Sequence, residues 1–203
     1  LLTVQGLSKS FGGVQANEDV NLAIRAGTVH AIIGPNGAGK TSLINMLSGV
    51  YRPDAGSIRL DGVELAGQAT HRFAAAGIGR TFQNLQVFFN MTALENVMTG
   101  RHLRERVSLS ASLLRLPSLV RAEAACQDAA RRLLRAVGLA AYEDAAADSM
   151  PYGALKRLEI ARALAAEPKL LLLDEPAAGL NATEAHEIDV LIKRLAADGM
   201  AVV

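Results

Sequence analysis

The sequence contains little of what marks disulfide-stabilised or metal-binding proteins. Among its 203 residues there is a single cysteine, Cys126, which excludes an internal disulfide framework and any metal site made of cysteines. The histidines, at positions 30, 71, 102 and 186, are scattered without the spacing of metal ligands. We expect Cys126, which lies in an alanine-rich helical stretch, to be a small core residue.

Neither sign of charge predominates, and no apolar run approaches the length of a membrane span. Lysine and arginine number 21 against 20 aspartate and glutamate residues, a net charge of +1, so the electrostatic signature of nucleic-acid or anionic-membrane binding is missing. The leucine run at 170–173 is bounded by Lys169 and Asp174. No secretory signal is visible. We therefore expect a cytosolic protein that does not bind nucleic acid and reaches a membrane only through a partner.

Residues 34–41 read Gly-Pro-Asn-Gly-Ala-Gly-Lys-Thr, which is a complete P-loop. Glycines allow consecutive backbone N–H groups to turn toward a phosphate, and the start of the following helix adds partial positive charge. The Lys40 ammonium can reach the β- and γ-phosphates, and the Thr41 hydroxyl can ligate Mg²⁺. The residues predicted to bind the nucleotide are Gly34, Asn36, Gly37, Gly39, Lys40, Thr41 and Ser42. The loop predicts binding of a nucleoside triphosphate.

Apolar runs and turn residues predict two kinds of strand. Residues 1–33 read as short strands with turns at 12–13 and 26–27, and residues 56–65 read as a hairpin around an Asp-Gly turn. The runs at 29–33 and 170–173 read instead as fully buried parallel strands.

Helical spacing predicts two helical regions. A helix is expected over 42–47, directly after the P-loop, and residues 92–137 are rich in alanine, leucine, arginine and glutamate. Pro117 divides the second region, and Gly138 is expected to cap its end. Together the elements predict an α/β P-loop NTPase core with a mainly parallel sheet, an antiparallel β edge subdomain and an inserted α-helical subdomain.

The predicted strand at 170–173 ends in two carboxylates. A buried strand would deliver Asp174 to its tip, beside the P-loop, where the carboxylate can hold a metal ion through water. Glu175, one residue further on, can orient and deprotonate an attacking water. With the P-loop upstream, this pair predicts an ATP hydrolysis site.

Five motifs, taken in order, resemble those of an ABC transporter ATP-binding subunit. Pro151 and Gly153 open a strongly helical segment. The motifs are the P-loop, Arg-Thr-Phe-Gln at 80–83, the helix opened by Gly153, Leu-Leu-Asp-Glu-Pro at 172–176, and Ala-Gly-Leu-Asn at 178–181. Residues 79–84 and 157–163 are similar to those of the LivG-type subunits of branched-chain amino acid importers.

The resemblance implies roles for further residues. Gln83 would sense the γ-phosphate and Mg²⁺, Phe11 would stack on adenine, and Gly153 would contact the nucleotide of a second subunit in trans. Mg²⁺ would be held by Thr41, Gln83 and, through water, Asp174. Catalysis would rest on Glu175, Lys40 and Gln83.

The resemblance also implies a division of the ABC ATP-binding domain, which would cover 1–203. The nucleotide core with its antiparallel edge would comprise 1–85 and 158–203, and the helical subdomain with the signature would comprise 86–157. That subdomain would begin near Met91 and dock against a membrane permease.

The signature departs from the family pattern Leu-Ser-Gly-Gly-Gln. Pro151 replaces the serine that binds a γ-phosphate, Ala154 replaces the glutamine, and Asn181 replaces the usual aspartate of a later loop. We expect Gly153 to act mainly through its backbone, with weakened phosphate contact. The family's switch histidine would follow Val203, and the first residue is not methionine, so we expect both ends to be truncated.

The implied ligands are ATP and Mg²⁺. The implied partners are a second, homologous ATP-binding subunit in an ATP-sandwich heterodimer, two transmembrane permease subunits and, indirectly, a periplasmic binding protein. The implied location is peripheral, at the cytoplasmic face of the inner membrane. Alternatives are the same ATPase role for urea or short amides, a soluble ABC ATPase of DNA repair or translation, and a P-loop kinase or GTPase. Nothing in the chain contacts the solute, so the cargo stays open.

Overall fold

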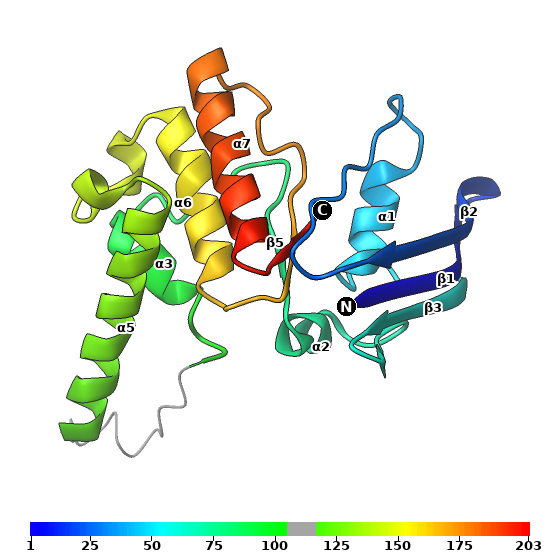
Figure 1. Ribbon diagram of the computed structural model, residues 1–203, viewed down its shortest axis with the longest axis horizontal. Helices are drawn as coiled ribbons and strands as arrows, with labels where there is room; N and C mark the ends of the chain where they lie inside the picture. Colours follow the sequence, from blue (N-terminus) through cyan, green and yellow to red (C-terminus); the bar gives the residue numbers. More distant parts are fainter. Residues whose placement is uncertain (105–116) are drawn as a thin grey trace. The chain divides into compact units, whose positions relative to one another are not determined.

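The computed structural model describes residues 1–104 and 117–203, which divide into two compact units (Figure 1). The first unit consists of Leu1–Arg80, Pro168–Glu175 and Asp189–Val203, and the second of Thr81–Glu167 and Pro176–Ile188. Helix α6 (Tyr152–Leu164) lies wholly in the second unit. The boundary predicted between residues 157 and 158 falls inside this helix, and the predicted division of the domain stays a prediction.

An antiparallel sheet of order β2-β1-β3-β4 forms one part of the first unit. Its strands are β1 (Leu2–Phe11), β2 (Val14–Ile24), β3 (Ala55–Leu60) and β4 (Val63–Glu64). The predicted hairpin is confirmed, and both residues of its turn, Asp61 and Gly62, have positive φ angles of 49° and 83°. β1 and β2 are longer than predicted, because register shifts after Val4 and Leu7 interrupt the alternation by which a strand is recognised.

A parallel sheet of order β5-β6-β7 forms the other part of the first unit. Its strands are β5 (Ile78–Arg80), β6 (Leu170–Leu172) and β7 (Ala201–Val202). All three leucines of β6 are fully buried between two neighbouring strands, which confirms the buried parallel strand predicted there.

The buried strand predicted at 29–33 is wrong. Val29 forms only an isolated bridge with Val202, and the side chains of Val29 and Ile33 are 49% and 90% exposed. His30 donates its N–H to Val202, but Val202 is the only β7 residue opposite this stretch. An apolar run becomes a buried strand only where neighbouring strands and helices cover it, and sequence alone does not supply them.

Helices α1 (Lys40–Leu47) and α2 (Thr70–Ala76) complete the first unit. The helix predicted over 42–47 is confirmed, and it begins at Lys40, immediately after the last glycine of the P-loop. Its buried side chains, Leu43, Ile44, Met46 and Leu47, share one core with both sheets. Packing against both sheets fixes the position of α1, and therefore of its N-terminal end, which the P-loop precedes.

The second unit is helical, with α3 (Ala93–Thr99), α5 (Pro117–Ala136), α6 and two 3₁₀ turns, η1 (Ala140–Tyr142) and η2 (Ala147–Ser149). α3, α5 and α6 pack on one another, and Cys126 is buried as predicted. Gly138, with φ 73°, follows the end of α5, where the cap was predicted. Part of the helical region predicted over 92–137, residues 105–116, lies outside the described residues.

Helix α7 (Ala182–Ala197) crosses from the second unit to the first between Ile188 and Asp189. In residues 1–104 and 117–203, no helix combines the length and the apolar character needed to cross a membrane.

Candidate functional site

The P-loop adopts the glycine-dependent turn that its sequence predicts. Gly37 and Gly39 have φ angles of 83° and 81°, which side chains with a Cβ rarely adopt. Gly39 also has no room for a side chain, because a Cβ there would collide with the carbonyl oxygen of Ala16 in β2. The Asn17 amide donates to the Gly39 carbonyl at 3.3 Å. The antiparallel sheet therefore fixes the end of the loop.

No side chain of the described residues caps the N-terminus of α1. Gly39 occupies the N-cap position, no side chain accepts a hydrogen bond there, and the first turn contains no acidic residue. By contrast, α3 begins with a capping box made by Thr92 and Glu95. Because the first N–H groups of a helix need an acceptor, the open start of α1 fits a phosphate.

Lys40 lies folded back on its own loop. Its ammonium donates to the carbonyl oxygens of Gly34 and Pro35 at 2.6 and 2.8 Å. Lys40 is the only cationic residue in the sequence of the P-loop, and both acceptors belong to the loop itself. Thr41, the next residue, is exposed. An ammonium held on neutral carbonyls can exchange them for anionic phosphate oxygens, which form stronger hydrogen bonds.

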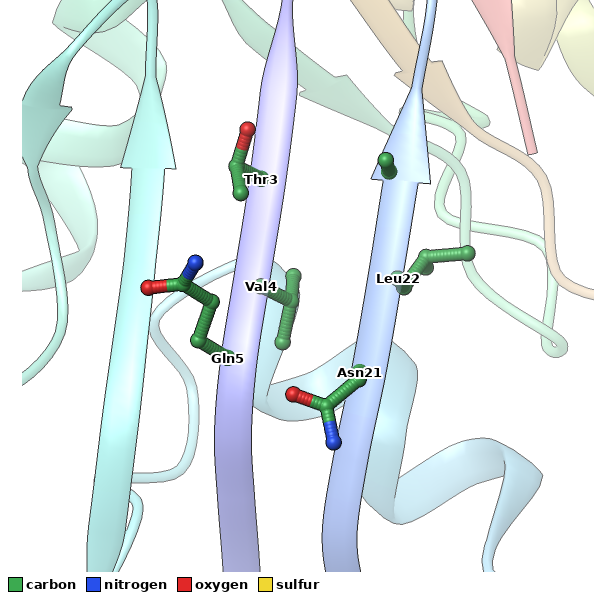
Figure 2. A pocket seen from close by; sticks show the side chains of 6 residues that line it. Thr3, Val4, Gln5, Asn21 and Leu22 are labelled. Carbon is green, nitrogen blue, oxygen red and sulfur yellow. The ribbon is translucent and has the colours of Figure 1, made fainter.

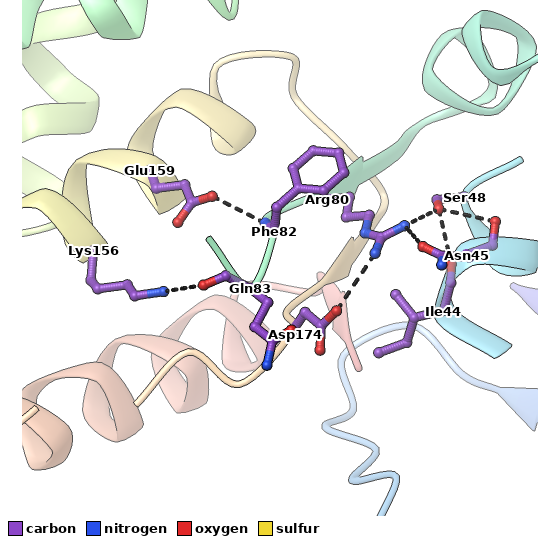
Figure 3. Close-up of polar contacts among 9 residues, drawn as sticks. All are labelled: Ile44, Asn45, Ser48, Arg80, Phe82, Gln83, Lys156, Glu159 and Asp174. Carbon is purple, nitrogen blue, oxygen red and sulfur yellow. Dashed lines mark hydrogen bonds and ion pairs between the residues drawn. The ribbon is translucent and has the colours of Figure 1, made fainter. Parts of the chain in front are cut away.

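Asp174, at the end of β6, is buried and paired with a partly buried arginine. The Arg80 Nη2 lies 3.5 Å from the Asp174 Oδ2, and each side chain is about 10% exposed. Arg80 Nη1 also donates to Asn45 at 2.6 Å and to Ser48 at 2.7 Å, both in or next to α1 (Figure 3). Burial lowers the pKa of Arg80, while the charge of Asp174 works against that shift. Arg80 thus ties the carboxylate to the helix behind the P-loop.

Glu175 has an unusual backbone. Its φ angle is 49°, a left-handed conformation shared by only three other non-glycine residues in the described part of the chain, Asp19, Asp61 and Glu167. For a residue with a Cβ this conformation costs about 1–2 kcal/mol. Such strain concentrates at functional sites, and the exposed Glu175 side chain is open to water. Both observations fit the predicted catalytic base.

Phe11, the predicted adenine platform, stands at the end of β1 with 42% of its surface exposed. Its ring meets Tyr51 edge-on, with centroids 5.2 Å apart at 66°, and the Lys9 ammonium lies 5.3 Å from its centroid. The exposed ring can accept a base by stacking, and this role stays a prediction.

Two predicted site residues, Gln83 and Gly153, belong to the second unit, whereas all the others belong to the first. Gln83 is exposed, and its backbone carbonyl accepts a hydrogen bond from the Lys156 ammonium at 3.2 Å. The helix predicted to open at Pro151 is confirmed, because α6 begins at Tyr152 with Pro151 as its N-cap.

The start of α6 differs from that of α1 because a carboxylate lies against it. Gly153 is buried, and a Cβ there would collide with the carboxylate of Glu184. Glu184 also accepts the N–H of Asn181 at 3.2 Å, while the Asn181 side chain accepts the N–H of Glu184 at 2.9 Å. This capping box starts α7, and its Asn-x-x-Glu pattern could have been recognised in the sequence. Its contact with Gly153 could not.

A hollow lies between β1 and β2 of the antiparallel sheet (Figure 2). It is lined by Thr3, Val4, Gln5, Asn21, Leu22 and Ala23, none of which was predicted to bind nucleotide. Asn21 is already engaged, since its side-chain oxygen accepts the N–H of Gly6. The hollow therefore adds nothing to the site.

The sequence is similar to transport proteins over almost its whole length. The ABC transporter family model matches residues 17–178. The high-affinity branched-chain amino acid transport ATP-binding protein BraF of Pseudomonas aeruginosa is 42% identical over 195 residues, which are 96% of this chain and 76% of the relative. LivG of Escherichia coli, which carries the same description, has the same identity and coverage.

Solved structures agree with the fold. A nucleotide-free ATP-binding cassette from an ABC transporter superimposes with a TM-score of 0.83 at 31% identity, covering 99% of this chain and 79% of that one. A dimeric ATP-binding cassette in a post-hydrolysis state, bound to ADP and phosphate, gives a TM-score of 0.81 at 25% identity, covering 100% of this chain and 86% of that one.

Proposed function

This chain belongs to the ABC transporter family of ATP-binding subunits, and from that membership we propose that it hydrolyses ATP to power an importer of branched-chain amino acids. The observation that carries the ATPase assignment is the uncapped start of α1. This helix begins at Lys40, and Gly37 and Gly39 in the preceding loop have left-handed backbone conformations. The cargo assignment is supported by the descriptions of BraF and LivG, each 42% identical.

We assign phosphate binding, charge stabilisation and activation of the attacking water to residues of the first unit. The N–H groups of the P-loop and of α1 would bind the phosphates, and the Lys40 ammonium would stabilise the charge that develops on them. Glu175 would accept a proton from the attacking water. Asp174, fixed by Arg80, has its position set before the nucleotide arrives.

The side chains proposed to hold Mg²⁺ supply only oxygen ligands, which suits this ion. They are the Thr41 hydroxyl, the Gln83 side-chain carbonyl and, through water, the Asp174 carboxylate. When bound, Mg²⁺ neutralises charge on the β- and γ-phosphates. The Arg80 guanidinium would then share Asp174 with a second cation.

We propose that the site is completed by a second, homologous subunit. The solved cassette bound to ADP and phosphate is dimeric. In such a sandwich each P-loop would face the Gly153 helix of the other subunit, and the two subunits would differ in sequence. The dimer would lie on the cytoplasmic face of the inner membrane, bound to two permease subunits and served by a periplasmic binding protein.

Replacing Pro151 by serine should strengthen the ATP-dependent dimer. Pro151 is exposed at the N-cap of α6, where a hydroxyl could donate to a γ-phosphate in trans. One hydrogen bond to a charged group contributes about 1.5–3 kcal/mol, or about ten- to a hundredfold in the dimer dissociation constant. Sedimentation at increasing ATP concentration measures this constant.

The matched control is Pro151→Ala, which removes the ring without adding a hydroxyl. Serine is also a good N-cap, so Pro151→Ser should raise the melting temperature of the free protein whether or not its hydroxyl contacts a phosphate. If Pro151→Ser and Pro151→Ala dimerise equally, the absent serine does not limit phosphate contact.

The cargo is tested by uptake. Cells lacking the protein should lose import of radiolabelled leucine, isoleucine and valine, because the importer would lack the subunit whose ATP hydrolysis drives transport. Restoring the full-length protein should restore import, and restoring a Glu175→Gln form should not. Normal amino acid import together with lost urea or short-amide import would move the assignment to those solutes. Unchanged import of every solute would favour a role outside transport.

A further inference from the structure

Two charged side chains of α6 are buried although no catalytic role has been given to them. Lys156 and Glu159 each expose only 3% of their surface. They stand three residues apart, so they project from the same face of the helix on neighbouring turns. Burying an ionised group is costly unless it is paired and hydrogen-bonded, so their partners indicate what they do.

The partners of both side chains are backbone groups around Gln83. The Glu159 carboxylate accepts the N–H of Phe82 at 3.0 Å, and the Lys156 ammonium donates to the Gln83 carbonyl at 3.2 Å (Figure 3). Glu159 also accepts a backbone hydrogen bond from Gln86. Three backbone groups of 82–86 are therefore held by α6, in a stretch that forms neither helix nor strand in the structure described.

Stability alone does not account for this arrangement. Burial raises the pKa of Glu159, although Lys156, Arg162 and its backbone donors favour the charged form. Apolar side chains of similar size would fill the same space without that cost, and buried ion pairs are often replaced in this way at no loss. Buried charges of this kind instead specify one arrangement of the groups they bind.

We propose that Lys156 and Glu159, here called the α6 clamp, are positioning residues that make Gln83 and the helix start at Gly153 move as one body. This inference rests on the proposed ATP sandwich. In that sandwich Gln83 serves the nucleotide of its own P-loop, and Gly153 serves the nucleotide of the partner subunit. The α6 clamp therefore couples the two ATP sites of the dimer.

Coupling of this kind has a kinetic signature. Two linked ATP sites in a dimer give a Hill coefficient for ATP of up to about 2, whereas two equivalent independent sites give about 1. Loss of the α6 clamp should lower the Hill coefficient toward that of independent sites. It should also lower kcat about ten- to a hundredfold through misplacement of Gln83, with the KM for ATP unchanged.

Four variants of the full chain test the proposal. Glu159→Leu removes the acceptor, Glu159→Gln keeps an acceptor oxygen of the same shape, and Lys156→Met removes the donor. Lys193→Met is the matched control, because Lys193 is 70% exposed and pairs only with the neighbouring Asp189 on α7 among the contacts described. The measurements are the Hill coefficient, kcat, KM, melting temperature and amide hydrogen exchange of residues 81–87.

In Glu159→Leu we expect the Phe82 amide to exchange about tenfold faster or more, because its acceptor is gone. Glu159→Gln should rescue both the slow exchange and the Hill coefficient, and Lys193→Met should match the original protein. Lys156→Met should lose cooperativity, and it provides the test if Glu159→Leu does not fold. Unchanged exchange and an unchanged Hill coefficient in the clamp variants would overturn the proposal. So would a parallel fall in kcat, affinity and melting temperature, which indicates a structural role alone.

The two ideas fail in different ways. If the original protein binds and hydrolyses no ATP, the proposed function fails, and exchange at Phe82 still reports whether the backbone is held. If the original protein hydrolyses ATP cooperatively and every clamp variant does the same, only the α6 clamp is disproved.

Discussion

Glu175→Gln will lower the rate of ATP hydrolysis about a thousandfold, within the range attributed to a general base, while ATP binding persists. Glutamine keeps the size of the side chain and loses the carboxylate that is proposed to accept the proton of water. Because binding persists and hydrolysis does not, ATP should then hold two subunits together. Phosphate release measures the first effect, and size-exclusion chromatography with and without ATP measures the second.

Glu167→Gln is the matched control for this experiment. Glu167 shares the left-handed backbone of Glu175, with φ 53°, and its side chain is 59% exposed and paired with Arg101 at 3.3 Å. The control therefore separates loss of a base from disturbance of a strained glutamate position. A Glu175→Gln protein that stays monomeric and hydrolyses ATP at full rate would exclude the sandwich mechanism.

Lys40→Met will weaken ATP binding by about a hundredfold or more. Charge-assisted hydrogen bonds contribute about 1.5–3 kcal/mol each, and in the proposed function Lys40 makes at least two of them with the β- and γ-phosphates. Methionine preserves the length of the side chain but supplies no donor. It also frees the Gly34 and Pro35 carbonyls that the ammonium now occupies. Titration calorimetry with ATP measures the loss.

Lys193→Met again serves as the control, because it removes the same charge from an exposed site on α7. Equal affinity of the Lys40→Met and Lys193→Met proteins for ATP would show that the P-loop binds phosphate through its backbone alone. The melting temperature without nucleotide should be similar in both variants, since neither lysine is part of the core.

Local patterns predicted the parts of the fold that depend on neighbouring residues. The glycine spacing before Lys40, the Asp61-Gly62 turn and the all-leucine strand β6 each specify one conformation over a few residues. Residues 29–33 show the limit of such patterns. Their apolar character is clear in the sequence, but the sequence does not show whether other elements cover them. Burial is a property of long-range pairing.

In the candidate site, too, the sequence predicts the residues that belong to local motifs and misses those that depend on contacts with distant segments. Lys40, Asp174 and Glu175 follow from motif chemistry, and the structure adds how Arg80 fixes Asp174. Lys156 and Glu159, by contrast, belong to residue types that are usually exposed, yet both are buried. The polar residues that act on another segment's backbone leave no periodic signal in the sequence. The roles of Lys40, Asp174 and Glu175 stay predictions, as do those of Phe11, Gln83 and Gly153.

The left-handed backbone of Glu175 places stability and the proposed reaction in conflict, because glycine suits this conformation best and has no carboxylate. Glycine at this position would relieve about 1–2 kcal/mol of conformational cost, so selection for a more heat-resistant protein would favour glycine and remove the proposed base. Replacement of the other strained glutamate, Glu167, carries no such conflict. Substitutions made to stabilise this protein at left-handed positions should therefore leave Glu175 unchanged, because the proposed rate of ATP hydrolysis depends on its carboxylate.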